Sequence, residues 1–174
     1  MNDELDRLWA GWRSSYVSGD DNASDIRPVP AGIGSIFERI LHSTLSDRDA
    51  YVLWRGDACA AMLNVYPYGT GHLMVMPTRA VPDLLDLTND EHAELWETVR
   101  SAVVALRSAY RPDGINVGTN LGNAGGASIP DHLHVHCLPR WSGDTTFLTT
   151  IAETRMMPEP LDLTWEKLKA AWPS

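Results

Sequence analysis

The stretch DHLHVHCL, residues 131–138, alternates histidine with apolar residues over most of its length. Successive side chains of a β-strand point to opposite faces of the sheet, so a strand over residues 133–138 presents histidines on one face and apolar residues to a core on the other. The histidines are His132, His134 and His136, and the apolar residues are Leu133, Val135 and Cys137. Packing gives no reason to align three histidines in this way, so we interpret the stretch as part of a functional site.

Four further strands are predicted outside this stretch, at residues 51–55, 58–66, 72–76 and 115–121. Residues 88–91 read Thr-Asn-Asp-Glu, the S/T-x-x-E pattern that begins helices, and apolar residues at helical spacing follow them. They predict one long helix over residues 91–110, and shorter helices are predicted at residues 35–45 and 161–171. Runs of strands with one long helix between them predict an α+β fold with an antiparallel sheet.

The length of 174 residues fits one domain, since domains usually hold about 100–200 residues. We assign residues 35–174 to this domain and residues 1–34 to an N-terminal extension. Leu5, Leu8, Trp9 and Trp12 recur at helical spacing and predict a short amphipathic helix inside the extension.

The charge balance restricts the partners, because 14 basic against 23 acidic residues give a formal charge of −9. No basic stripe that would hold a nucleic acid is visible, and no apolar run is long enough to cross a membrane. The first residues lack the apolar core of a secretory signal, and two cysteines cannot build a disulfide framework. We therefore expect a cytoplasmic protein with no nucleic-acid or membrane partner, which leaves small phosphate ligands open.

The three aligned histidines allow two functional interpretations. A metal site would require all three imidazoles to converge, although His132 and His136 have Cα atoms about 13 Å apart on an extended strand. The other interpretation is a histidine nucleophile whose tautomer is fixed by its neighbours. The glycine-rich loop before the histidines, residues 122–128, can offer backbone N–H groups to phosphate oxygens, which favours the nucleophile.

Several blocks around the histidines resemble the histidine triad (HIT) superfamily. They are His132-x-His134-x-His136 itself, NVYPYGTGHLMVMP at residues 64–77, NLGNAGGAS at residues 120–128 and PRWSGDTTF at residues 139–147. Within the superfamily the chain is most similar to bacterial diadenosine tetraphosphate phosphorylases. Three residues separate Ser128 from His132, one more than in the short hydrolase-type members, which favours the phosphorylase-like branch.

The resemblance implies a role for each matching residue. His134 would attack the α-phosphate, His136 would contact phosphate oxygens, His132 would hold the tautomer of His134 through its carbonyl, and His72 would pack against the triad. The residues implied for ribose, phosphate and leaving-group binding are Asn64, Asn120, Gly126 and Ser128. From the residues themselves we add the backbone donors of the loop, starting at Gly125, and Arg140, whose guanidinium can bind phosphate in a bidentate way.

The implied function is nucleotidyl transfer through a nucleotidyl-histidine, with diadenosine tetraphosphate split by inorganic phosphate into ATP and ADP. The alternatives are hydrolysis of dinucleoside polyphosphates or nucleoside phosphoramidates, and a nucleotide-binding module without catalysis. Many bacterial relatives carry a structural zinc site, but here Ser35 and Glu38 occupy the C-x-x-C positions and Ala80 replaces the histidine ligand. We therefore expect no zinc and no permanently bound cofactor, and a homodimer or higher homo-oligomer.

Overall fold

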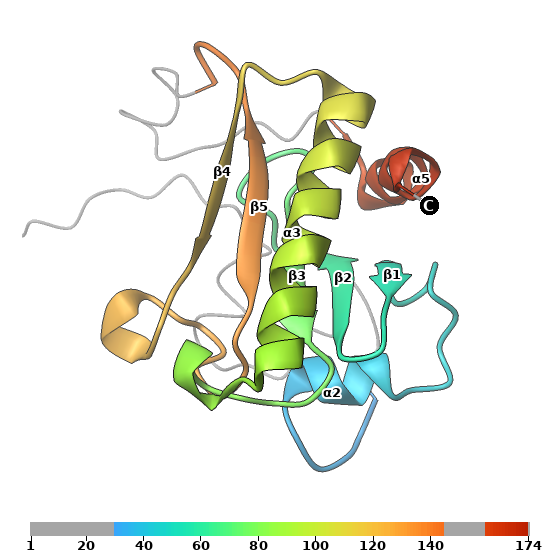
Figure 1. Ribbon diagram of the computed structural model, residues 1–174. Helices are drawn as coiled ribbons and strands as arrows, with labels where there is room; N and C mark the ends of the chain where they lie inside the picture. The colour runs from blue at the N-terminus through green and yellow to red at the C-terminus, as the bar shows by residue number, and fades with distance from the viewer. Residues whose placement is uncertain (1–29, 145–158, 174) are drawn as a thin grey trace, which may run out of the picture.

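Within the described part of the chain, five strands form one antiparallel sheet in the order β1-β2-β3-β5-β4 (Figure 1). The computed structural model describes residues 30–144 and 159–173. The strands are β1 (Val52–Arg55), β2 (Cys59–Leu63), β3 (Leu73–Pro77), β4 (Gly114–Thr119) and β5 (Val135–Arg140). The predicted α+β class and the antiparallel sheet are confirmed.

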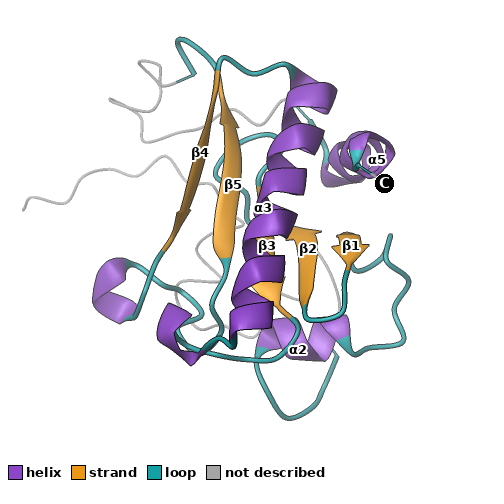
Figure 2. Cartoon of the chain, viewed as in Figure 1, coloured by secondary structure: helices purple, strands orange, loops and turns teal. Residues whose placement is uncertain are grey.

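Helices lie on both faces of this sheet (Figure 2). The long helix α3 (Asn89–Tyr110) packs on β2, β3 and β5, and α5 (Leu161–Ala171) packs on α3 and β1. The short helix α2 (Ile36–Leu41) packs on the opposite face. Two single-turn 3₁₀ segments, Leu84–Asp86 and Asn123–Gly125, lie in the connections.

The end signals of α3 explain its length. Thr88 accepts the N–H of Glu91, and the Glu91 carboxylate accepts the N–H of Thr88, so the predicted capping box is formed. Arg111 stops the helix in the left-handed conformation with φ of 46°, and Pro112 follows it. Observed and predicted bounds agree to within two residues at the start of α3 and coincide for α5.

The sheet separates two hydrophobic clusters because strand residues alternate between its faces. On β2, Cys59, Ala61 and Leu63 face the α3 cluster, whereas Ala60 and Met62 face the α2 cluster. The same alternation on β5 places the predicted apolar residues in the α3 cluster: they are Leu133, Val135 and Cys137. The triad histidines therefore lie on the α2 face.

Some element bounds differ from the predicted ones, and local hydrogen bonds explain why. The predicted strand over residues 58–66 ends at Leu63, because the Asn64 side chain accepts the N–H of Tyr66 in a turn. The predicted strand over residues 133–138 begins only at Val135, because the N–H of Leu133 donates to Val81 O at 2.6 Å. The predicted helix of the N-terminal extension lies outside the described residues.

Two sequence expectations concern membrane-spanning segments and the cysteines. Within residues 30–144 and 159–173, no helix is long and apolar enough to span a membrane. Cys59 and Cys137 are both free and buried. Burial raises the pKa of each thiol to about 12, so both stay protonated at neutral pH.

Candidate active site

Four histidines gather on the α2 face of the sheet, where β3 and β5 run side by side. His136 pairs with Met74 of β3, and Met74 belongs to the α2 cluster. His72 immediately precedes β3, and His134 immediately precedes β5. The ring centroids of His134 and His136 are 4.8 Å apart, and those of His72 and His136 are 5.0 Å apart.

His134 is held as a neutral imidazole with a free lone pair on Nε2. Its Nδ1 lies 2.8 Å from the carbonyl oxygen of His132, and a carbonyl can only accept, so Nδ1 carries the proton. Burial lowers the pKa of His134, which keeps the ring neutral near pH 7. The arrangement leaves Nε2 as a nucleophilic nitrogen.

His136 is held in the opposite tautomer by a chain of hydrogen bonds. The backbone N–H of Tyr68 donates to His72 Nδ1 at 3.0 Å, so the proton of His72 sits on Nε2. That Nε2 lies 2.9 Å from His136 Nδ1, which must accept, so the proton of His136 is on its own Nε2. Burial, reinforced by His134, lowers the pKa of His136 to about 4. A neutral N–H donor thus lies beside the neutral nucleophile.

His132 lies behind the other two and is fully buried. Its Nε2 donates to the carbonyl oxygen of Pro77 at 2.9 Å, and its Nδ1 lies 2.5 Å from the hydroxyl of Ser35. Its backbone carbonyl is the one that holds His134. The carbonyl of His132 is therefore directed at His134 Nδ1, the contact that the resemblance implies.

Three more residues that contact the histidines were missed by sequence reasoning. Thr119 of β4 donates its hydroxyl to the carbonyl oxygen of His134 at 2.8 Å, and Phe37 of α2 meets the rings of both His132 and His134 edge-on. Ser35 is the third. Its S-x-x-E spacing to Glu38 is the same helix-start signal that was used at Thr88, so the cap could have been found, although its contact with His132 could not.

The glycine-rich loop before the histidines closes on itself through its own hydrogen bonds. Gly122 and Gly126 have φ of 67° and 90°, a backbone conformation that glycine adopts without strain, and the Asn120 side chain donates to Gly126 O. The N–H groups of Gly125 and Gly126 donate to carbonyl oxygens within the loop, in contrast to the expectation that they are directed at a ligand. The loop also contains Ser128, whose side chain is exposed.

Two other predicted ligand-binding residues occupy different places. Asn64 follows β2 directly, and its backbone N–H donates to His72 O at 3.0 Å, so it lies next to the histidines. Arg140 lies four residues along β5 from His136, about 13 Å away. Its guanidinium bonds to Asp144 and to Asn116. The structure brings Asn64 to the histidines and pairs Arg140 with protein groups instead.

The positions that hold zinc in many bacterial relatives do not fit a metal here. The hydroxyl of Ser35 is hydrogen-bonded to His132, both carboxylate oxygens of Glu38 accept backbone N–H groups, and Ala80 has no donor atom. Among residues 30–144 and 159–173, no group of three or more His, Cys, Asp or Glu side chains could hold a metal ion. The absence of zinc stays a prediction.

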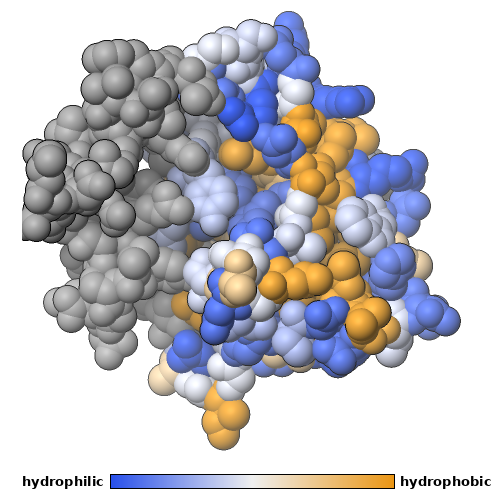
Figure 3. All heavy atoms as spheres, turned by 90° about the vertical axis from the view of Figure 1, so that its left-hand side faces the viewer, coloured by the Kyte–Doolittle hydropathy of each residue, from blue (hydrophilic) through white to orange (hydrophobic). Residues whose placement is uncertain are grey.

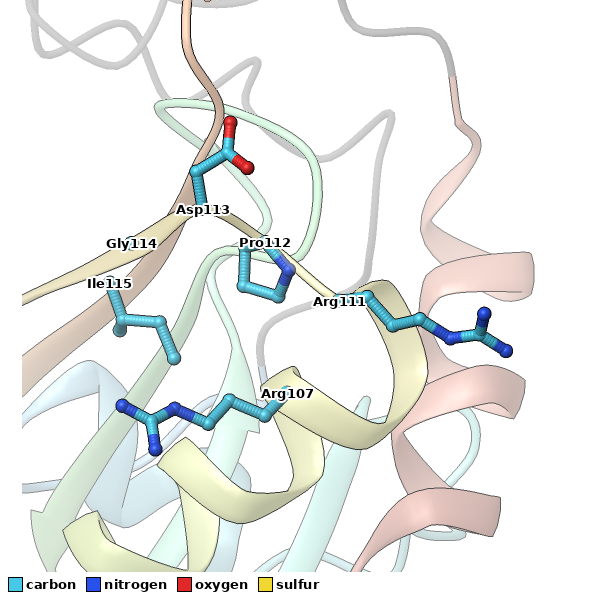
Figure 4. Close-up of a pocket in the computed structure, with 6 residues that line it drawn as sticks. All are labelled: Arg107, Arg111, Pro112, Asp113, Gly114 and Ile115. Atoms are coloured by element: carbon cyan, nitrogen blue, oxygen red, sulfur yellow. The ribbon is translucent and has the colours of Figure 1, made fainter.

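A pocket of about 350 Å³ lies elsewhere, at the junction of α3 and β4. Its lining residues are Arg107, Arg111, Pro112, Asp113, Gly114 and Ile115. Figure 4 shows the guanidinium groups of Arg107 and Arg111 pointing away from each other, so the two charges do not converge on one anion. The pocket contributes nothing to the histidine site.

Comparison with known proteins decides the family. A family model for the HIT domain matches residues 46–143, which include β1 to β5 and all four site histidines. The chain belongs to the HIT domain family. The α+β fold of this HIT domain is the one that the sequence predicted.

Individual relatives of this HIT domain protein match between about half and nearly all of its chain. It is 41% identical to AP-4-A phosphorylase of Mycobacterium tuberculosis over 99% of this chain and 87% of the relative. It is 37% identical to the asymmetrical bis(5'-nucleosyl)-tetraphosphatase of Schizosaccharomyces pombe over 53% of this chain and 50% of that protein. The crystal structure of a hypothetical histidine triad nucleotide-binding protein of Sulfolobus tokodaii matches with a TM-score of 0.63 and 28% identity, over 78% and 89% of the two chains.

The buried histidines of this HIT domain predict a loss of stability in mild acid. Folding lowers the pKa of His132, His134 and His136 below the usual 6.5, so the unfolded chain binds protons that the folded chain does not. The free energy of unfolding is therefore expected to be retained above about pH 6.5 and to fall as the pH drops from there toward about 4. Urea unfolding between pH 7.5 and 4.5 measures this.

The His136→Gln variant serves as the comparison for this prediction, because glutamine takes up no proton in that range. Its unfolding free energy should depend less steeply on pH between 6.5 and 4 than that of the wild type. Identical pH dependence of the two proteins would contradict the pKa of about 4 that burial gives His136.

Proposed function

We propose that this HIT domain protein transfers a nucleotidyl group from a dinucleoside polyphosphate to His134 and then to inorganic phosphate, with diadenosine tetraphosphate as the substrate and ATP and ADP as products. The observation that carries the proposal is the pairing of complementary tautomers. His134 offers a lone pair on Nε2, and His136, 4.8 Å away between ring centroids, offers an N–H. The 41% identity to an AP-4-A phosphorylase supports the choice of substrate.

The first step forms a bond between His134 Nε2 and the α-phosphorus and breaks the bond to the bridging oxygen, so ATP leaves and AMP stays attached to the histidine. The carbonyl of His132 stabilises the positive charge that develops on the ring, because it already accepts the Nδ1–H. The N–H of His136 donates to an oxygen of the α-phosphate, where negative charge develops. Splitting the displacement in two suits imidazole, which is both a good nucleophile and a good leaving group.

The second step forms a bond from a phosphate oxygen to the same phosphorus, which releases ADP and returns the electron pair to Nε2. Water in place of phosphate would release AMP instead, which is the hydrolase alternative. The likeness to the asymmetrical tetraphosphatase keeps that alternative open. The role of Arg140 in holding the phosphate stays a prediction, since binding there would compete with Asp144 for the guanidinium.

The dependence on inorganic phosphate tests the proposal. We expect diadenosine tetraphosphate to yield ATP and ADP, at a rate that rises with phosphate concentration and approaches zero without it. Chromatography of the products with and without phosphate measures both. ATP and AMP at a rate indifferent to phosphate would establish a hydrolase, and cleavage of nucleoside phosphoramidates alone would indicate another branch of the family.

Mass spectrometry separates the enzyme from a nucleotide-binding module without catalysis. Protein quenched during turnover should carry an adenylyl group on His134. Tight nucleotide binding with neither adduct nor turnover would support the module instead.

We also propose that two copies pair along the edge strand β4. An edge strand leaves backbone groups open to pairing with another chain, and β4 is the last of the strands that the structure describes in this sheet. Exposed apolar side chains lie on and near it and on α3: they are Val117, Leu121, Trp96 and Val104. Figure 3 shows hydrophobic residues gathered on this side of the molecule. Light scattering should give the mass of a dimer or larger oligomer, and Val117→Lys should shift it toward a monomer.

The remaining properties that we propose follow from charge and composition. The net charge of −9 supports a protein without nucleic-acid or membrane partners, and the cysteine content supports a cytoplasmic location. The residues at the three positions that correspond to zinc ligands, Ser35, Glu38 and Ala80, support a domain without structural zinc. Metal analysis of the purified protein is expected to find no stoichiometric zinc, and one zinc per chain would contradict this.

A further inference from the structure

The first turn of α2 touches the buried side of the triad. Ser35 is the N-cap of α2 and is 4% exposed, and its hydroxyl lies 2.5 Å from Nδ1 of His132, a residue 97 positions away in the chain. Phe37, two residues further on, places its ring edge-on to His132 and His134, with centroid distances of 5.4 and 5.2 Å. One helical turn therefore contacts two of the three triad histidines.

The direction of each hydrogen bond around Ser35 can be assigned. His132 Nε2 faces a carbonyl oxygen of Pro77, so it carries the proton, and the neutral ring leaves Nδ1 as an acceptor. The Ser35 hydroxyl must then donate to Nδ1, while its oxygen accepts the N–H of Glu38 at 3.1 Å. The serine thus uses its proton for the histidine and its lone pair for the helix.

Glu38 fixes this turn to the end of β3. One oxygen of its carboxylate accepts the N–H of Ala80 at 2.8 Å, and the other accepts the N–H of Ser35 at 3.1 Å. These two backbone bonds lower the pKa of Glu38, so the group stays ionised at neutral pH. The carboxylate of Glu38 thus links the backbone of Ser35 to that of Ala80, three residues after β3.

We propose that Ser35 is a positioning residue for the nucleophile. By holding the ring of His132 between its hydroxyl and Pro77 O, it keeps the backbone carbonyl of His132 directed at His134 Nδ1, which leaves His134 Nε2 free to attack. The proposal deepens the proposed function, because it rests on His134 as the nucleophile. A purely structural role, capping α2, is the competing explanation.

The Ser35→Ala variant tests the proposal, and Thr88→Ala is its matched control. Both remove a hydroxyl N-cap from a complete capping box, but Thr88 caps α3, which covers the other face of the sheet. We expect Ser35→Ala to lower kcat by about 10- to 100-fold with KM little changed, as is usual when a partner behind an active-site histidine is removed. Thr88→Ala should change kcat by less than about twofold, and Ser35→Thr should restore most of the activity.

Nitrogen-15 spectra of the histidine side chains provide a readout that needs no substrate. The wild type should show His134 protonated on Nδ1 only, and Ser35→Ala should show a mixture of its two tautomers, whereas Thr88→Ala should match the wild type. This measurement separates the two proposals, since it stands even if diadenosine tetraphosphate is not a substrate. Unchanged kcat and unchanged tautomers in Ser35→Ala would overturn the role of Ser35.

Ser35→Asp keeps the test decisive if the alanine variant does not fold. Aspartate caps helices as well as serine does, but its carboxylate can only accept, so His132 must take up a second proton to keep the contact. We expect a folded protein with a doubly protonated His132 and a kcat about 10-fold or more below that of the wild type. Wild-type kcat in this variant would overturn the proposal, because the arrangement around His132 would then not matter for turnover.

Discussion

His134→Asn is expected to lower the turnover of diadenosine tetraphosphate by about 10⁴-fold or more, as is typical when the nucleophile of a covalent mechanism is removed. Asparagine has no lone pair that could replace His134 Nε2, so the bond to the α-phosphorus cannot form. The fold should survive, because the asparagine amide can donate to the carbonyl oxygen of His132, which accepts the Nδ1–H of His134 in the wild type. Initial rates with saturating substrate and phosphate measure the effect.

A second histidine provides the control for this substitution. His92 lies exposed on α3, so His92→Asn removes an imidazole without touching the triad, and its rate should stay within about twofold of the wild type. Thermal unfolding should show that both variants are folded. A His134→Asn variant with wild-type turnover would mean that another group attacks the phosphate.

His136→Ala is expected to lower kcat by about 10²- to 10³-fold, the usual effect of losing one preorganised donor to a developing negative charge. The variant lacks the Nε2–H that faces the substrate side, and it leaves His72 Nε2–H without its acceptor. His136→Gln should recover part of the rate, because its amide supplies both a donor and an acceptor. Single-turnover kinetics, which follow the formation of the adenylyl-histidine, measure the step directly.

The two variants should also differ in the adduct that they form. His136→Ala should still form the adenylyl-histidine, only slowly, whereas His134→Asn should form none. If His136→Ala kept the wild-type rate, the donor to the phosphate oxygen would have to lie elsewhere, and the loop that contains Gly126 and Ser128 would be the next place to test.

The sheet and the long helix could be predicted from the sequence because their signals are local. Alternation along β5 and the capping box at Thr88 depend on neighbours at most four residues away. The start of β5 could not be predicted in this way, because the N–H of Leu133 donates to Val81 O, 52 positions earlier in the chain. Sequence periodicity contains no information on such a distant partner.

The candidate site also combines residues that the sequence predicts with contacts that only the fold reveals. The three triad histidines were predicted from their alternation, and His72 and Asn64 from the resemblance to the family. The structure brings all five together. The contact between Ser35 and His132 spans 97 residues, so only the fold could reveal it. The partner of Arg140 was missed for a different reason. The sequence does not show whether a guanidinium at the end of a strand binds a ligand or a nearby carboxylate, here that of Asp144.

Alternation along β5 has a consequence for how this chain can change in length. Because each residue faces the side opposite to its neighbour, deleting or adding one residue in the strand would turn His136 toward α3 and Cys137 toward the ligand. Such a change of one residue would remove His136 from the active site and place its imidazole in the hydrophobic cluster under α3. The loop before the histidines has no such alternation. Insertions or deletions between Gly122 and His132 can therefore change the loop while each residue of β5 keeps its face of the sheet.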